Sequence, residues 1–76
     1  MIHVTIKLFA QYRENRFKAE QRVYPKGTRA NDIIEELRFT KELPLGVLMV
    51  NSRHESESYT LQEGDIIALF PKVGGG

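Results

Sequence analysis

Apolar and polar residues alternate at the start of the sequence, in MIHVTIKLFA. An extended chain sends successive side chains to opposite faces, which separates Ile2, Val4, Ile6 and Leu8 from His3, Thr5, Lys7 and Phe9. This pattern predicts a half-buried strand. The segment DIIALF alternates in the same way, with Ile67 and Leu69 on one face and Ile66, Ala68 and Phe70 on the other. Because the first and last strands are the most apolar, we expect them to be the central strands of one sheet.

One amphipathic helix is predicted over residues 29–38. Its apolar positions follow the helical spacing i, i+3, i+4 and i+7, at Ala30, Ile33, Ile34 and Leu37. The preceding PKG indicates a turn, and Thr28 is a candidate N-cap whose hydroxyl could accept from amides of the first helical turn. Asp32 and Arg38 have the charges that the two ends of a helix dipole favour.

Two shorter strands are expected at EQRVY and VLMVN, and Gly64 suggests a tight turn before the last strand. QYRENRFK and SRHESES are polar connections, and FTKELPLG is irregular. A further strand, with a less clear sequence pattern, would bring the sheet to four or five strands. The helix is expected to lie across one face of this sheet. The sequence thus predicts a single α+β domain.

Composition narrows the possible functions. A chain of 76 residues with 41% hydrophobic and 28% charged residues is typical of one small soluble domain. The net charge of +1 gives no reason to expect nucleic acid or a membrane as the partner, and no apolar run predicts a signal peptide or a membrane span. Residues 1–31 carry seven Lys and Arg against two acids. In the folded domain these charges could be scattered over the surface, or they could form a positive patch that helps a partner dock, and both possibilities stay open. We expect a cytoplasmic protein.

Residues for catalysis or metal binding do not group along the sequence. There is no cysteine, no glycine-rich phosphate loop and no HExxH or CxxC motif. His3 and His54 are predicted to be ordinary surface residues, and Glu35 and Glu36 to face solvent from the helix. We therefore expect no catalytic residue, no metal and no bound cofactor in this chain, which would not be an enzyme by itself.

The sequence ends in LFPKVGGG, and we divide it into a domain over residues 1–70 and a flexible tail over residues 71–76. A frayed end or a linker remnant would explain three glycines. A terminal glycine also offers a carboxyl group that no Cβ shields, on a tether thin enough to enter a partner's active site. Because an α-carboxylate is an unreactive anion at neutral pH, a partner would have to activate it, for example by adenylation.

Several segments in order resemble the MoaD/ThiS family of small sulfur-carrier proteins. LFAQYRE resembles the family's LFA-x-x-RE segment, and GTRANDIIEEL its Gly-Thr turn and helix. VLMVNSR resembles the V-x-V-N turn, and LQEGDIIALFPKVGGG the L-x-x-GD-x-(apolar)-FP-x-V-x-GG ending. The resemblance covers nearly the whole chain and implies the ubiquitin-like β-grasp fold, with a mixed sheet.

The resemblance also implies a function. An E1-like enzyme similar to MoeB or ThiF would adenylate the Gly76 carboxylate with ATP and magnesium, and the product would be converted to a thiocarboxylate. The sulfur would pass to a synthase similar to the molybdopterin synthase large subunit or to thiazole synthase, with molybdopterin favoured. Gly74 and Gly75 would thread into the partner's active site, and Phe70, Pro71 and Val73 would lie at the partner interface.

Two other functions stay open. A ubiquitin-like modifier would use the same activation and then join Gly76 to lysines of target proteins. A plain interaction domain would leave the tail unused. The segment between the helix and VLMVN is intermediate in length between those of MoaD and ThiS, and Gly74 stands where the family more often has a small non-glycine residue. The sequence does not identify the pathway or the sulfur donor.

Overall fold

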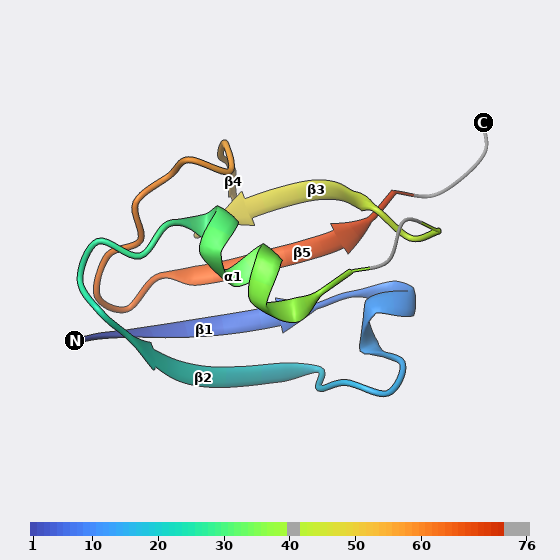
Figure 1. The fold of residues 1–76 in the computed structure, drawn as a ribbon, viewed down its shortest axis with the longest axis horizontal. Helices are drawn as coiled ribbons and strands as arrows, with labels where there is room; N and C mark the ends of the chain where they lie inside the picture. The colour runs from blue at the N-terminus through green and yellow to red at the C-terminus, as the bar shows by residue number, and fades with distance from the viewer. Residues whose placement is uncertain (40–41, 73–76) are drawn as a thin grey trace.

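The computed structural model describes residues 1–39 and 42–72 and contains one sheet, one α-helix and one short 3-10 helix (Figure 1). Their order along the chain is β1 (Ile2–Leu8), η1 (Ala10–Arg13), β2 (Ala19–Tyr24), α1 (Ala30–Leu37), β3 (Leu45–Val50), β4 (Arg53–His54) and β5 (Ile66–Pro71). The strands lie in the order β2-β1-β5-β3-β4. This arrangement confirms the α+β prediction and the additional strand.

The first and last strands lie side by side at the centre of the sheet, as predicted. β1 pairs in parallel with β5, from Thr5 opposite Ile66 to Leu8 opposite Leu69. The remaining neighbours, β1 with β2, β3 with β5 and β3 with β4, are antiparallel, so the sheet is mixed. Because β1 and β5 run in the same direction, β5 ends beside the end of β1 (Figure 1).

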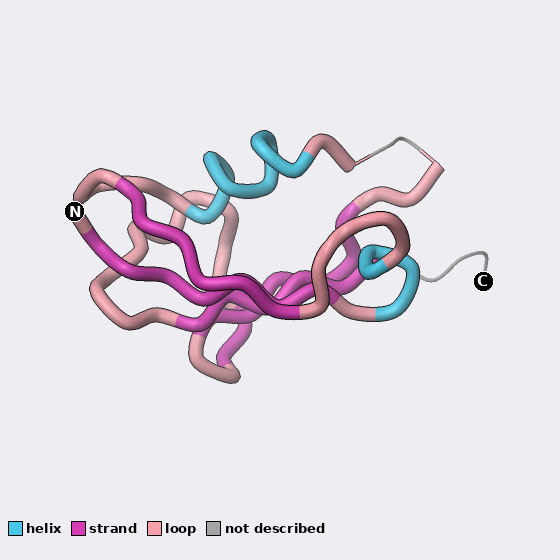
Figure 2. The backbone as a smooth tube through the Cα atoms, turned by 90° about the horizontal axis from the view of Figure 1, so that it is seen from below, coloured by secondary structure: helices cyan, strands magenta, loops and turns pink. Residues whose placement is uncertain are grey.

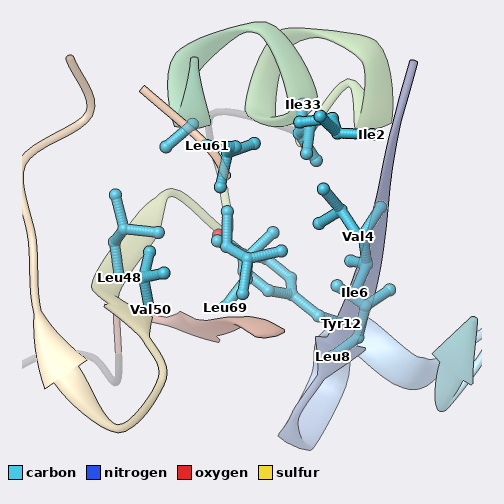
Figure 3. Packing of buried hydrophobic residues seen from close by; sticks show 12 residues of the cluster. Ile2, Val4, Ile6, Leu8, Tyr12, Ile33, Leu48, Val50, Leu61 and Leu69 are labelled. Carbon is cyan, nitrogen blue, oxygen red and sulfur yellow. The ribbon is translucent and has the colours of Figure 1, made fainter. Parts of the chain in front are cut away.

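The hydrophobic core fills the space between the sheet and α1, which covers one face (Figures 2 and 3). The inward sides of β1 and β5 supply its centre. The side chains without exposed surface include Val4, Ile6, Leu8, Ile67 and Leu69 from these strands and Ala30 and Ile33 from the helix. Within the described residues, the helices are too short to cross a membrane.

The helix begins one residue later than the predicted cap. Arg29, and not Thr28, occupies the N-cap position, and the Asp32 carboxylate accepts a hydrogen bond from the Arg29 backbone N–H at 2.9 Å. The Thr28 hydroxyl instead donates to the carbonyl of Pro25 at 2.8 Å. Thr28 therefore belongs to the preceding turn, and an acidic residue inside the helix does the capping.

The connection after β1 is more ordered than its polar sequence indicates. It contains η1, whose Tyr12 is completely buried. The Tyr12 ring stacks on Phe39 with centroids 3.8 Å apart, and its hydroxyl donates to the Leu43 carbonyl at 3.0 Å. Burial raises the pKa of the Tyr12 hydroxyl above its ordinary value. Tyr12 thus ties the turn after β1 to the segment that enters β3.

A buried carboxylate organises the turn before β5. Asp65 accepts hydrogen bonds from the Asn51 side-chain amide at 2.8 Å, the Gln62 backbone N–H at 2.8 Å and the Tyr59 hydroxyl at 3.2 Å. The Asn51 side-chain oxygen accepts from the Ile66 N–H at 2.9 Å. Burial, followed by the negative charge of Asp65, raises the pKa of Tyr59. The Asn of VLMVN and the Asp of GD therefore join β3 to the start of β5.

Removing the Asn51 amide should destabilise the fold. Its φ of 51° lies in the left-handed region, which glycine tolerates, so Asn51→Gly removes the hydrogen bonds without adding backbone strain. We expect the free energy of unfolding, measured in urea, to fall by about 1–3 kcal/mol. The control Asn15→Gly, at an exposed position with φ 57°, should change it by less than about 0.5 kcal/mol. Equal losses in the two variants would contradict a structural role for the Asn51 amide.

Candidate functional site

Within the part of the chain that the structure describes, no helix covers the face of the sheet opposite α1 (Figure 2). The outward residues of β5 and β3 make its central part apolar, through Ile66, Ala68, Phe70 and Met49. A shallow hollow of about 230 Å³ lies there and is lined by Lys7, Phe9, Met49, Asn51, Ser52, Ile66, Ala68 and Phe70. We call the part of this face formed by Phe9, Met49, Ile66, Ala68 and Phe70 the open face.

Two aromatic rings stack on the open face near the end of β5. Phe9 follows β1 and Phe70 lies in β5, and their ring centroids are 4.3 Å apart with an angle of 11° between the ring planes. The Phe9 backbone N–H donates to the Leu69 carbonyl at 3.2 Å, which extends the β1–β5 pairing to this point. Both side chains are half-buried, so the pair still offers aromatic surface to a partner.

Basic side chains border this aromatic pair. The Arg13 guanidinium lies 5.1 Å from the centre of the Phe9 ring, and its Nε donates to the Leu8 carbonyl at 2.7 Å. Lys7 and Lys18 join Arg13 and Phe9 around a second open hollow of about 470 Å³. The aromatic surface is therefore combined with positive charge, an arrangement that fits a partner surface carrying aromatic or aliphatic groups beside carboxylates.

The last strand leaves the sheet next to this surface. Pro71 is buried and pairs with Leu45 of β3, and the Lys72 backbone N–H donates to the Pro44 carbonyl at 2.8 Å. The chain is thus held to β3 as far as Lys72. From Lys72 to Gly76, at about 3.3–3.6 Å per residue, the backbone can span at most roughly 14 Å.

The structure places two of the predicted interface residues. Phe70 lies on the open face, whereas Pro71 is inside β5 and buried, which leaves Phe70 as the accessible one of the two. β5 thus extends one residue past the expected domain boundary. Val73, Gly74, Gly75 and Gly76 lie outside the described residues, so their roles and the predicted tail stay predictions.

Sequence reasoning missed Phe9, Arg13 and Met49 as parts of the same surface. The alternation in β1 had placed Phe9 opposite the core side, and the alternation in β5 had done the same for Phe70. What was missing was the parallel register that sets Leu8 beside Leu69 and so brings the two rings together. Arg13 could not be assigned because η1 was not predicted.

Glu35 and Glu36 are exposed on α1, as predicted. His3 and His54 are exposed, and His3 contacts Glu63 at 3.2 Å. The hydrogen bond from the His3 backbone N–H, followed by that from its side chain, lowers the pKa of Glu63. Among the described residues, no three His, Cys, Asp or Glu side chains gather as metal ligands would.

Comparison with known proteins identifies the family. The model of the ThiS family matches residues 6–76, which is nearly the whole sequence, and the chain belongs to this family. This result confirms the predicted resemblance to small sulfur carriers. A search of curated protein sequences finds no match.

Solved structures of ubiquitin-like proteins share the fold. A Pyrococcus furiosus protein assigned as subunit 1 of molybdopterin converting factor is 26% identical, with a TM-score of 0.78 over 96% of this chain and 100% of that one. Small archaeal modifier protein 1 of Haloferax volcanii is 18% identical, with a TM-score of 0.75 over 96% and 100%. The complex of subunits 1 and 2 of molybdopterin-converting factor from Helicobacter pylori provides a further similar chain, 21% identical, with a TM-score of 0.63 over 99% and 100%. The β-grasp prediction is confirmed.

Adjacent residues of β5 should respond differently to truncation. Phe70 is half-buried, so Phe70→Ala should lower the free energy of unfolding by about 1–2 kcal/mol, through lost stacking and partial burial. Leu69 is completely buried, and Leu69→Ala should cost more, within about 2–5 kcal/mol. Urea unfolding followed by circular dichroism measures both. If Phe70→Ala costs as much as Leu69→Ala, Phe70 is a core residue and not a surface anchor.

Proposed function

We propose that this protein is a sulfur carrier that works through the carboxyl group of Gly76. Membership of the ThiS family supports this function most directly, because the match extends through the glycines at the end of the sequence. The arrangement of the domain agrees with it. β5 brings the chain to Lys72 beside the open face, so a partner that docks there has the four remaining residues within reach.

The proposed reaction begins with adenylation. A carboxylate oxygen of Gly76 attacks the α-phosphorus of ATP, pyrophosphate leaves, and an acyl adenylate forms. A hydrosulfide-equivalent donor then attacks the carbonyl carbon, which releases AMP and a proton and leaves a thiocarboxylate. The E1-like partner, similar to MoeB or ThiF, supplies ATP, magnesium and the residues that catalyse this step. This chain contributes the carboxyl group and its delivery.

Gly74 and Gly75 would form the tether inside the partner's active site. Without a Cβ, a glycine backbone passes between close walls that a larger residue would contact. Val73 is the last residue with a side chain that a partner can grip, and Phe70 would anchor the domain outside. The Phe9–Phe70 pair with Arg13 beside it fits such an anchor, since aromatic and arginine side chains contribute much of the binding energy of protein interfaces.

The acceptor of the sulfur is proposed to be a synthase of cofactor biosynthesis. The Pyrococcus furiosus relative is assigned to molybdopterin converting factor, and the Helicobacter pylori neighbour is one of two subunits in a complex. These neighbours and the LFA-x-x-RE-like segment favour molybdopterin over the thiamin thiazole. The partner would then resemble a molybdopterin synthase large subunit.

A second function is conjugation to proteins. The likeness to small archaeal modifier protein 1 favours it, because a protein of this fold carries that name. The adenylation step would be the same, and a lysine amine of a target would then take the place of the sulfur nucleophile. An isopeptide bond to Gly76 would be the product.

Intact mass spectrometry of the protein isolated from its native host separates these functions. A carrier should show a C-terminal Gly76 in which one oxygen is replaced by sulfur, and it should lose this species when the activating enzyme is deleted. A modifier should instead yield branched peptides with the glycine tail on lysine. If deletion of Gly76 leaves every pathway of the host intact and neither product is found, both tail-based functions are wrong.

The open face should contribute to binding of the activating enzyme. Phe9→Ala and Phe70→Ala should each raise the dissociation constant for the host's adenylating enzyme by about 10- to 30-fold, because each removes one ring of the stack. The control Val23→Ala removes an exposed apolar side chain from β2, and it should leave binding unchanged. Isothermal titration calorimetry measures the three constants. Equal effects of all three substitutions would contradict a localised docking surface.

A further inference from the structure

The start of β3 and the end of β5 are joined by an irregular pairing at Gly46. Leu45 pairs with Pro71 and Val47 with Phe70, so β3 has two residue steps where β5 has one. Gly46 is the extra residue of this bulge, and it lies directly against the point where the chain leaves the sheet. Bulges of this kind bend a strand and change the direction of the chain beside them.

The contact at Gly46 is too close for any side chain. A Cβ built on Gly46 would lie 2.6 Å from the Lys72 Cα, 2.8 Å from the Lys72 N and 2.9 Å from the Pro71 carbonyl oxygen. All three are backbone atoms, so no rotamer change could relieve the contact. The φ of Gly46 is not in the positive region, unlike those of Gly27 and Gly64. Glycine is therefore required at this position for space and not for backbone conformation.

The residue before the bulged strand completes the hold on the chain. The Pro44 carbonyl accepts the Lys72 N–H at 2.8 Å, one residue beyond the end of β5. Pro44 is itself next to Leu43, whose carbonyl accepts the hydroxyl of the completely buried Tyr12. A path of direct contacts thus runs from Tyr12 in the core through Leu43 and Pro44 to Lys72.

We infer that Gly46 and Pro44 form an exit clamp that sets the direction in which the chain leaves the domain. This inference rests on the proposed function for its purpose. Because the backbone from Lys72 to Gly76 can span at most roughly 14 Å, a change of direction at Lys72 would move the Gly76 carboxyl group away from the reaction centre of the docked partner. Gly46 is on this basis a positioning residue. It acts through the backbone of Lys72, which it closely approaches.

The clamp can be tested without any partner. In Gly46→Ala, the Lys72 amide should exchange with deuterium at least about tenfold faster than in the natural protein, because its bond to Pro44 is broken locally. The Ile67 and Leu69 amides should keep their protection. Tyr12→Phe keeps the ring and removes the hydroxyl, and it should also speed exchange of the Lys72 amide, by a smaller factor than Gly46→Ala. Unchanged exchange at Lys72 in Gly46→Ala would overturn the clamp.

Steady-state kinetics with the host's adenylating enzyme test its purpose. Gly46→Ala should lower kcat for adenylation by about 10- to 100-fold while KM changes by less than about threefold, because docking remains and the carboxyl group is misplaced. Phe70→Ala should instead raise KM. Gly27→Ala serves as the stability control, since it strains a turn with φ +98° at the other end of the sheet (Figure 1) and should leave kcat unchanged.

The outcomes separate the two proposals. If Gly46→Ala loses Lys72 protection but keeps its kcat, the clamp does not position the carboxyl group and the inference fails. The inference also fails if adding Lys72→Ala to the Gly46→Ala variant restores kcat. The contact with residue 46 would then be made by the Lys72 side chain and not by its backbone. If the natural protein is not adenylated at all, the proposed function fails, and the exchange of the Lys72 amide still decides whether the clamp exists.

Discussion

The parallel pairing of β1 with β5 is the constraint on which the rest of this molecule depends. It places the two most apolar strands at the centre of the sheet, where their inward residues meet α1 and close the core. On the outward side, the same register brings Phe9 against Phe70. Since the two strands run in one direction, the end of β5 emerges beside Arg13 and the turn after β1. The core, the open face and the exit of the chain are three consequences of this single alignment.

The elements that depend on local patterning were predictable from the sequence. The period of two in β1 and β5 and the helical period in α1 correctly indicated the central strands and the covered face. The features that the sequence did not predict have a common cause, because they depend on contacts between residues far apart in the sequence. Tyr12 is buried because Phe39 and Leu43 come to it from a distant segment, and Asp65 is buried because Asn51 and Tyr59 supply its partners.

The candidate site was predictable to a smaller extent. Phe70 was correctly placed on the face away from the core, but its partner Phe9 depends on a register that no local pattern contains. Gly46 belongs to the segment FTKELPLG, which was predicted to be irregular, whereas it is a residue of β3 that permits a backbone contact with Lys72. The space that a missing side chain leaves is visible only when the neighbouring backbone is known.

The central pairing has a consequence for how the chain acquires its structure. Residues near position 5 must meet residues near position 66, so the middle of the sheet cannot form until β5 has been synthesised and has left the ribosome. Such non-local contacts slow folding, because the chain must lose the entropy of closing a long loop before the contacts stabilise it. A nascent chain that still lacks β5 has β1 with an unpaired edge and an uncovered apolar side. The strand that carries the chain out of the sheet to Lys72 is therefore also the strand whose arrival completes the domain.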